Sequence, residues 1–276
     1  MIHNSIQKTV GRRTALLLTQ LWEQNKPTFT LADVESITGV RGISARTLIH
    51  KAQKRGLVTR LQRGLYTLVP AELGAATEYV GNPFVIAKNL VHGEAYFLSH
   101  RSAMELHHMV TQPQFSLVVS CAKPMRPRTI HGYEYRFLVV RPKLFFGVTT
   151  LWIDKQQSVE VSDLERTIID GLRQPKYVGG VTEVARAVAL RRKDLNTKRL
   201  VDYALRLESG AVIRRLGFLL ETMDLATPTS IDLLRSRLTS TYAPLDTTMP
   251  AEGEFQARWR LLVNVPADEL RVVGNS

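Results

Sequence analysis

The segment from residue 44 to residue 69 constrains the fold more than any other part of the chain. Its first half places apolar side chains at the spacing of one helix face, at Ala45, Leu48, Ile49 and Ala52. Ser44 is the predicted N-cap, because its hydroxyl can accept a hydrogen bond from a backbone N–H of the first turn. Gly56 is predicted to end the helix, since glycine readily adopts the left-handed conformation found after helix C-termini.

Two short strands are predicted after this helix, at residues 57–61 and 65–69. Arg63 and Gly64 lie between them and suit a tight turn. A short basic helix followed by a basic-tipped hairpin is typical of a winged helix-turn-helix. Such a helix fits the major groove of DNA, and such a wing can contact the flanking phosphates.

The residues before this segment complete a small domain. Helices are predicted at 13–24 and 31–38, with Thr30 capping the second, and residues 1–11 are expected to form a loose arm. Three helices and a hairpin in about 60 residues match the usual size of the motif. We therefore expect a winged helix-turn-helix DNA-binding domain at residues 10–70.

The candidate DNA-binding side chains lie away from the apolar face of the 44–55 helix and on the wing. The predicted base-reading face holds Arg46, Thr47, His50 and Lys54. Lys51, Arg60 and Arg63 are better placed for phosphates, and Arg41 and Ser44 stand at the start of the helix. Arginine can form two hydrogen bonds with one guanine, which gives sequence discrimination. The alternative is a solvated helix face with no ligand.

The charge of the chain agrees with a polyanionic partner. The formal net charge is +12, and residues 1–78 hold 11 Lys and Arg against 5 Asp and Glu. Residues 161–276 are nearly balanced, with 17 against 15. The excess is therefore concentrated near the predicted DNA-binding domain, where neutralising phosphates would release counterions. Solubility alone is the plainer explanation of a basic chain.

Several classes of protein are disfavoured by composition. No apolar run approaches the ~20 residues that a membrane span requires. The opening residues lack the apolar core of a secretory signal. Cys121 is the only cysteine, which excludes an intrachain disulfide and a multi-cysteine zinc site. We expect a cytoplasmic protein without a membrane partner and without a cofactor.

The fold class predicted for the whole chain is α+β, with a larger mixed α/β domain at residues 78–270 whose C-terminal part is helical. Strands are predicted at residues 96–98, 115–120, 133–140, 151–153, 159–161 and 259–263, the last returning to the same sheet. Helices are predicted at 83–91, 99–107, 162–172, 180–190, 197–207, 211–223 and 231–238.

An acidic segment offers an enzymatic alternative. Ser162 and Glu165 fit the S-x-x-E capping box, and Asp163 would complement the helix dipole. Arg166 and Asp170 are four residues apart and can pair on one helix face. In the alternative, Glu165 and Asp170 lead a Mg²⁺ site of a metal-dependent nuclease with a DNA-targeting head. A following lysine or second acid in a recognisable strand arrangement is missing.

Two other kinds of site are weaker candidates. His100, His107 and His108 are close in sequence, but neither a cysteine nor an HExxH pattern accompanies them, which disfavours zinc. Ser158 and Ser162 lack the context of a nucleophile elbow, so a serine hydrolase is unsupported.

Several segments form a recognisable series along the chain: RGLYTLVP, PFVIAKNL, AYFLSHRSAMELHHM, SDLERTIIDGLRQPKYVGG, RRLGFLLE and a terminal W-x-L-L-V-N. Taken in order, these segments resemble the AbiEi antitoxins of type IV toxin–antitoxin and abortive-infection systems. The resemblance runs from about Arg13 to Asn264. One departure is His107-His108-Met109, where the family pattern leads us to expect a histidine–glycine pair.

The resemblance implies a function that composition alone could not give. It implies a transcriptional autorepressor, not an enzyme, whose winged helix binds promoter inverted repeats in double-stranded DNA and whose larger domain supports cooperative binding and self-association on DNA. That domain would also neutralise a nucleotidyltransferase-like toxin, without a stable toxin–antitoxin complex. Basic residues that could touch DNA, RNA or a target of the toxin include Arg191, Arg192, Lys193, Lys198 and Arg199. A pure interaction module that binds a toxin is a third interpretation.

Overall fold

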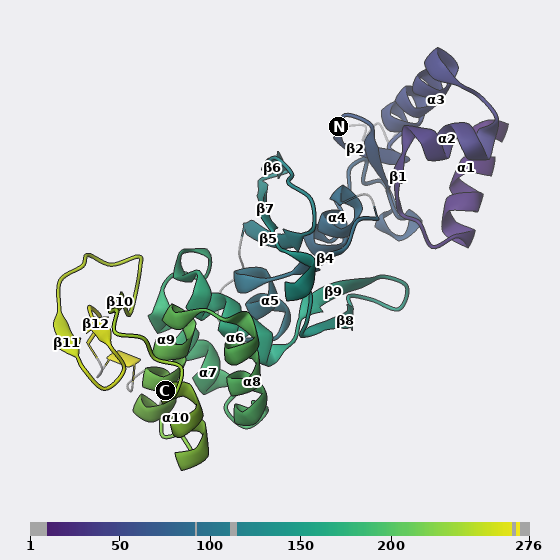
Figure 1. Cartoon of the computed structure of the whole chain (residues 1–276). Helices are drawn as coiled ribbons and strands as arrows, with labels where there is room; N and C mark the ends of the chain where they lie inside the picture. The colour runs from purple at the N-terminus through teal and green to yellow at the C-terminus, as the bar shows by residue number, and fades with distance from the viewer. Residues whose placement is uncertain (1–9, 92, 111–114, 267–268, 271–276) are drawn as a thin grey trace, which may run out of the picture. The chain divides into compact units, whose positions relative to one another are not determined.

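The computed structural model describes residues 10–91, 93–110, 115–266 and 269–270, so most of the arm expected at residues 1–11 lies outside the described part of the chain (Figure 1). The chain forms two compact units. Unit 1 contains residues 1–93 with two short returns, 128–134 and 152–158, and unit 2 contains the remainder. Whether residues 10–70 fold on their own stays a prediction.

Unit 1 begins with the predicted three helices and hairpin. The elements are α1 (Arg12–Glu23), β1 (Thr28–Thr30), α2 (Leu31–Thr38), α3 (Gly42–Lys54), β2 (Val58–Gln62) and β3 (Leu65–Leu68). The three strands form a small sheet in the order β1-β3-β2, with both pairings antiparallel. Strand β1 was not predicted, because its three residues carry too short a pattern to recognise.

One apolar core holds these elements together. Leu17 and Leu21 of α1, Phe29 of β1, Val34 of α2 and Ile49 of α3 are all buried in it. The apolar face predicted for α3 is confirmed, since Ala45, Ile49 and Ala52 are its buried residues. The opposite face of α3 is left to solvent, and it carries the basic residues.

The prediction that Ser44 caps the third helix is wrong. Helix α3 begins two residues earlier, at Gly42, with Arg41 at the N-cap position. The Arg41 side chain makes no capping bond, and instead the Glu35 carboxylate of α2 accepts a hydrogen bond from the Gly42 backbone N–H at 2.9 Å. Because this acceptor comes from the preceding helix, α3 can start without a local capping side chain. The predicted Thr30 cap of α2 is confirmed, and Asp33 completes a reciprocal capping box with it.

The rest of unit 1 connects and supports the hairpin. It contains a short 3-10 turn, η1 (Ala71–Leu73), and α4 (Pro83–Leu90), whose N-cap is Asn82. The returning segment 128–134 contacts strand β2, because Arg128 donates a hydrogen bond to the Gln62 side chain at 3.0 Å. The second return reaches the end of α1, where the Gln157 amide donates to the Asn25 carbonyl at 2.7 Å.

A six-stranded sheet has the order β6-β7-β5-β4-β9-β8. Its strands are β4 (Tyr96–Leu98), β5 (Ser116–Cys121), β6 (Arg128–Ile130), β7 (Tyr133–Val139), β8 (Val148–Trp152) and β9 (Ser158–Ser162). Strand β4 pairs antiparallel with β5 and parallel with β9. The predicted strands of this region are confirmed to within a few residues, and β6 was not predicted. Helix α5 (His100–Leu106) follows β4, and a 3-10 turn, η2 (Pro142–Leu144), precedes β8.

Helices dominate the chain after residue 163. They are α6 (Leu164–Arg173), α7 (Val181–Leu190), α8 (Thr197–Leu207), α9 (Gly210–Thr222) and α10 (Pro228–Arg235), with the 3-10 turn η3 (Pro175–Tyr177) after α6. Their apolar faces form a core that includes Ile168, Leu172 and Leu216, and Phe97 of β4 is buried in the same core. The mixed fold class predicted from the sequence is therefore confirmed.

The predicted capping box at Ser162 is wrong, because Asp163 is the N-cap residue of α6 and accepts a hydrogen bond from the Arg166 N–H at 2.7 Å. Ser162 belongs to β9, and its hydroxyl lies 2.8 Å from the Thr167 hydroxyl. Glu165 accepts from the Asn196 N–H instead of reaching back to the cap. The helix starts later than predicted because Ser162 is the last residue of β9 and therefore has extended conformation.

The C-terminal strands form a sheet of their own. Strand β12 (Leu261–Val263) pairs parallel with β10 (Ala243–Pro244) and antiparallel with β11 (Glu254–Gln256). The prediction that the last strand returns to the main sheet is therefore wrong. Trp259, just before β12, lies against α9, where a side chain at Gly217 would meet its ring at 2.1 Å. The Trp259 indole N–H donates to Glu221 of the same helix at 2.6 Å, which fixes this sheet on α9.

Candidate DNA interface

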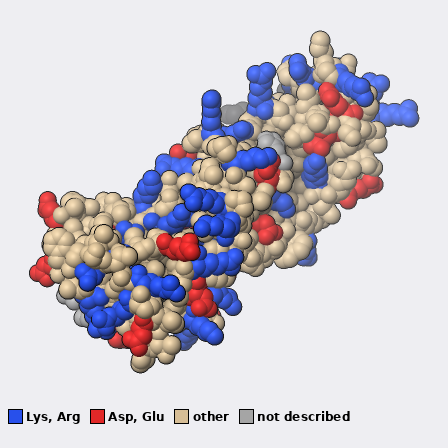
Figure 2. Space-filling model, viewed as in Figure 1, with Lys and Arg blue, Asp and Glu red and all other residues tan. Residues whose placement is uncertain are grey.

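Helix α3 presents a continuous polar face to solvent. All nine residues predicted to contact DNA are exposed: Arg41, Ser44, Arg46, Thr47, His50, Lys51, Lys54, Arg60 and Arg63. In Figure 2, Lys and Arg side chains project from the part of the surface where Figure 1 places α3. The predicted set is thus accessible to a ligand.

One side of this face turns toward the wing. Arg46 and His50 of α3 line a hollow of about 410 Å³ together with Arg60 of β2 and Arg63 of the turn. Gln53 of α3 also lines it, one helical turn beyond His50 and two turns beyond Arg46. The structure therefore brings four of the predicted residues together between the helix and the hairpin.

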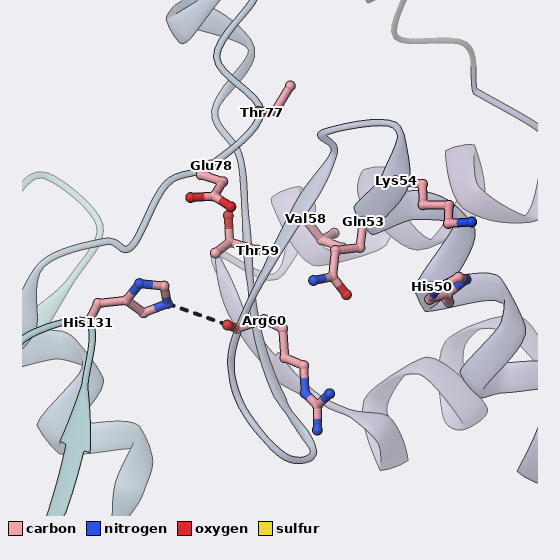
Figure 3. Close-up of a pocket in the computed structure, with 9 residues that line it drawn as sticks. All are labelled: His50, Gln53, Lys54, Val58, Thr59, Arg60, Thr77, Glu78 and His131. Atoms are coloured by element: carbon pink, nitrogen blue, oxygen red, sulfur yellow. Dashed lines mark hydrogen bonds between the residues drawn. The ribbon is translucent and has the colours of Figure 1, made fainter.

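A second hollow of about 520 Å³ shares His50, Gln53 and Arg60 with the first (Figure 3). His50 and Lys54 line it from α3, and His131 lines it from the turn between β6 and β7. The His131 Nε2 lies 3.4 Å from the Arg60 carbonyl oxygen, to which it can donate when that nitrogen carries the proton. Glu78 is the acidic residue of this lining, which makes the hollow less cationic than the first.

The other predicted residues of α3 lie on the opposite side of the helix. Ser44, Thr47 and Lys51 line a hollow of about 270 Å³ with Arg13 of α1. Thr47 therefore lines a different hollow from Arg46 and His50, although the sequence predicted all three on one reading face. The described lining of this hollow, like that of the hollow beside the wing, contains no carboxylate.

The wing itself is a short, irregular hairpin. The pairing of β2 with β3 shifts register between Arg60 and Gln62, as in a β-bulge. The Arg60 Nε donates to the Gln62 carbonyl at 3.3 Å, which orients the guanidinium near the bulge. Gly64 has a φ of 81°, a conformation that glycine adopts without strain, so the turn can present the exposed Arg63 at its tip.

The three hollows are also lined by residues that were not predicted as DNA contacts, among them Arg13, Ile43, Gln53 and His131. Gln53 and Ile43 could have been found by extending the helical face by one turn in each direction. Arg13 and His131 come from elements that are distant along the chain, and no local pattern marks them. His131 reaches the wing across 71 residues of sequence.

The acids proposed for the alternative nuclease site are engaged in structural contacts. Asp170 receives a hydrogen bond from the Arg166 Nε at 2.9 Å, and both side chains are almost fully buried. Glu165 accepts from the Asn196 N–H at 2.7 Å and from Arg199 at 3.3 Å. The predicted pairing of Arg166 with Asp170 is confirmed. Over the described residues, no group of three or more His, Cys, Asp or Glu side chains could hold a metal ion.

Burial shifts the pKa values of Asp163 and His100, which lie outside α3 and the wing. Desolvation raises the pKa of Asp163, although hydrogen bonds from the Arg166 N–H and the Tyr203 hydroxyl lower it in part. Burial lowers the pKa of His100 to about 4, so this imidazole is neutral at pH 7. His100 Nδ1 lies 2.9 Å from the Ser99 hydroxyl, whereas His107 Nε2 faces the Ser162 carbonyl at 2.6 Å. These two histidines therefore make separate structural contacts.

The basic residues expected on the C-terminal surface are partly used within the fold. Arg191 pairs with Asp194 and donates to the His107 carbonyl, and Arg192 donates to the Asp224 carbonyl. Lys193 and Lys198 are exposed. This surface therefore has fewer available cations than its sequence suggests.

The elements of residues 12–68, with a basic exposed third helix and a basic hairpin, define a winged helix-turn-helix. Residues 17–69 match the family AbiEi_4, described as "Transcriptional regulator, AbiEi antitoxin". This match confirms the resemblance to AbiEi antitoxins over those residues, which begin within α1, include α2, α3 and the wing, and end just after β3.

The whole chain also has a relative in fold. The crystal structure of the RV2827C protein from Mycobacterium tuberculosis superposes with a TM-score of 0.70 at 14% sequence identity, covering 99% of this chain and 98% of that one. At this identity the likeness shows the fold alone. No curated protein matches the chain. Within the described residues, no helix has both the length and the apolar character needed to cross a bilayer.

Proposed function

We propose that this chain is a sequence-specific DNA-binding autorepressor and the antitoxin of a type IV toxin–antitoxin system. The observation that carries the proposal is the hollow between α3 and the wing, where Arg46, His50, Arg60 and Arg63 converge. This hollow lies within the segment that matches a family of transcriptional regulators and antitoxins. Promoter inverted repeats are the proposed double-stranded DNA target, and the cytoplasm is the proposed location.

In this proposal α3 enters the major groove and the wing follows the backbone. The N-terminal residues of a recognition helix contact base edges in helix-turn-helix proteins, which gives Arg46 the central position, and His50 lies one helical turn after it. Arg60 and Arg63 would contact phosphates, and such contacts fix the register of the protein without reading sequence. The side with Thr47 and Lys51 would face the other edge of the groove.

The proposed function does not include catalysis. The carboxylates of Glu165 and Asp170, which would lead a nuclease site, are buried and bonded to partners within the fold. Incubating the purified protein with supercoiled plasmid and Mg²⁺ separates the two functions. A repressor retards the plasmid without cutting it, and cleavage abolished by Asp170→Asn would establish the alternative.

The replacement Arg46→Ala tests the reading helix. It should weaken binding to the promoter by roughly 1–3 kcal/mol at ~150 mM salt, because a pair of hydrogen bonds to one base is lost. Lys155→Ala is the matched control, since Lys155 is also exposed in unit 1 but lies outside α3 and the wing. Electrophoretic mobility shifts would measure both affinities, and equal losses in the two variants would exclude α3 as the reader.

The antitoxin role is supported by the family match and needs a cellular assay. The partner proposed is a nucleotidyltransferase-like toxin encoded next to this chain, antagonised without a stable complex. Co-expression should restore growth to cells that produce the toxin, while gel filtration of the two proteins should give separate peaks. A stable co-eluting complex would favour the interaction-module interpretation.

A further inference from the structure

Ile43 is the most exposed large apolar side chain of the described residues. Its side chain is 80% exposed, and it stands in the first turn of α3, directly after the first helical residue, Gly42. Isolated surface isoleucines are common, so exposure alone means little. The position is informative, because the first turn of a recognition helix is the part that meets base edges.

The surroundings of Ile43 combine apolar and cationic groups. The hollow beside it has a floor of Val40 and Leu48, which are partly buried against the core of unit 1. Ser44 and Thr47 add hydroxyls, and Arg13 and Lys51 supply the cations of its lining. An apolar surface flanked by cations suits a DNA strand whose phosphates contact the cations while a base edge faces the apolar side chain.

The backbone around Ile43 is held in place before any ligand binds. Gly42 has a φ of 57°, and its N–H is bonded to the Glu35 carboxylate. A Cβ at Gly42 would meet no atom within 4 Å, so the glycine serves the backbone conformation and not the packing. The β-branched Ile43 side chain has few rotamers in a helix, so little rotational entropy is lost when a ligand contacts it.

We propose that Ile43 reads the C5-methyl group of a thymine in the major groove. This inference rests on the proposed DNA binding and specifies one base of the DNA target. Among the groups that base pairs present in the major groove, the thymine methyl is the apolar one, and the others are hydrogen-bond donors and acceptors. An isoleucine facing any other base edge would leave a donor or acceptor without a partner. Arg46 and His50 supply hydrogen bonds, and Ile43 supplies apolar discrimination one turn earlier.

Deoxyuridine provides the test, because it differs from thymidine only by lacking this methyl group. The probe is the duplex that the full chain selects from a random library, resynthesised with one thymine at a time replaced by uracil. For the unmodified protein, one position in each half-site should weaken binding about four-fold, which corresponds to ~0.8 kcal/mol for one buried methyl group. For Ile43→Ala the same replacement should change binding less than 1.5-fold, while other positions keep their effect.

The variants are chosen so that folding does not confuse the result. Ile43→Ala replaces an exposed residue by a better helix former, so α3 should persist. Leu16→Ala is the matched control, because Leu16 is an exposed apolar residue of α1, 46% exposed, outside the lining of this hollow. It should retain the full uracil effect.

The outcomes separate this inference from the function on which it rests. If the unmodified chain selects no duplex, the proposed function fails. If it selects a duplex and Arg46→Ala weakens binding, but no uracil position distinguishes Ile43→Ala from the unmodified protein, the Ile43 inference alone is wrong. A change in self-association of Ile43→Ala with an unchanged uracil scan would likewise overturn it, in favour of a contact between two copies of the chain.

Discussion

The Glu35 carboxylate accepts a hydrogen bond from the backbone N–H of Gly42, so the last turn of α2 caps the first turn of α3. The two residues are separated by the turn that contains Gly39, whose left-handed conformation ends α2. A negative charge at this point also complements the dipole of α3. This side chain of α2 therefore links the end of one helix of the motif to the start of the next.

Replacing Glu35 by alanine should destabilise the start of α3. A lost capping interaction costs roughly 0.5–2 kcal/mol, because the Gly42 N–H and its neighbours are left without a protein acceptor. Glu35→Gln should recover most of this stability, since its amide oxygen can still accept the bond. Hydrogen exchange of the amides of residues 42–45 would measure the effect.

The control for this replacement is Glu72→Ala, which removes the same charge from an exposed site in η1. Equal amide exchange in the Glu35 and Glu72 variants would show that the cap contributes nothing measurable.

The wing variants Arg60→Ala and Arg63→Ala should weaken binding to all duplexes by about the same factor. Phosphate contacts carry no sequence information, and each one lost should make the slope of log K against log salt shallower by about 0.9. Mobility shifts at several salt concentrations, on specific and random duplexes, would measure both quantities. A loss confined to one base position would make the wing a base reader instead.

Much of unit 1 could be predicted from sequence because its signals are local. The buried face of α3, the Thr30 cap and the hairpin all depend on residues within a few positions of one another. The Ser44 cap was mispredicted because the real acceptor, Glu35, lies seven residues upstream of the Gly42 that it caps. A pattern search near the helix start favours the nearest hydroxyl and cannot weigh a carboxylate from another helix.

Longer-range contacts could not be predicted from the sequence, because their partners are far apart along the chain. The pairing of Arg166 with Asp170 follows from their spacing, but the bonds from Arg166 to the Leu144 and Phe146 carbonyls, which hold it in the core, do not. The contacts of Arg128 and His131 with the wing arise only when the turn between β6 and β7 meets β2. The pairing of β12 with β10 and β11 likewise depends on tertiary structure and not on strand propensity.

Acidification should destabilise the fold through His100. Between pH 6.5 and about 4 the unfolded chain binds a proton that the buried imidazole does not, so the free energy of unfolding falls as pH decreases through this window. The full effect is of the order of 3 kcal/mol. Urea denaturation at pH 7 and pH 5 would measure the part of this effect that falls between those two pH values, about 2 kcal/mol.

The variant His100→Asn isolates this contribution, because asparagine tolerates the positive φ of 53° at this position and does not titrate. Its loss of stability between pH 7 and pH 5 should be smaller than that of the unmodified chain. An identical loss in both proteins would assign the acid sensitivity to other groups.

The last prediction separates repression from antitoxic activity. Residues 1–75 include the apolar core of Leu17, Phe29, Val34 and Ile49, so this piece should fold and bind single half-sites. Its affinity should be modest, because a single small module buries little DNA surface and the piece lacks the contact from Arg128 to the wing.

Residues 76–276 retain the surface available for cooperativity, and by the AbiEi resemblance they should carry the antitoxic activity. We therefore expect residues 1–75 to repress a promoter reporter weakly without rescuing cells from the toxin, and residues 76–276 to rescue growth at least in part. Full rescue by residues 1–75 at matched expression would mean that protection is transcriptional silencing alone, and the larger domain would then need a different role.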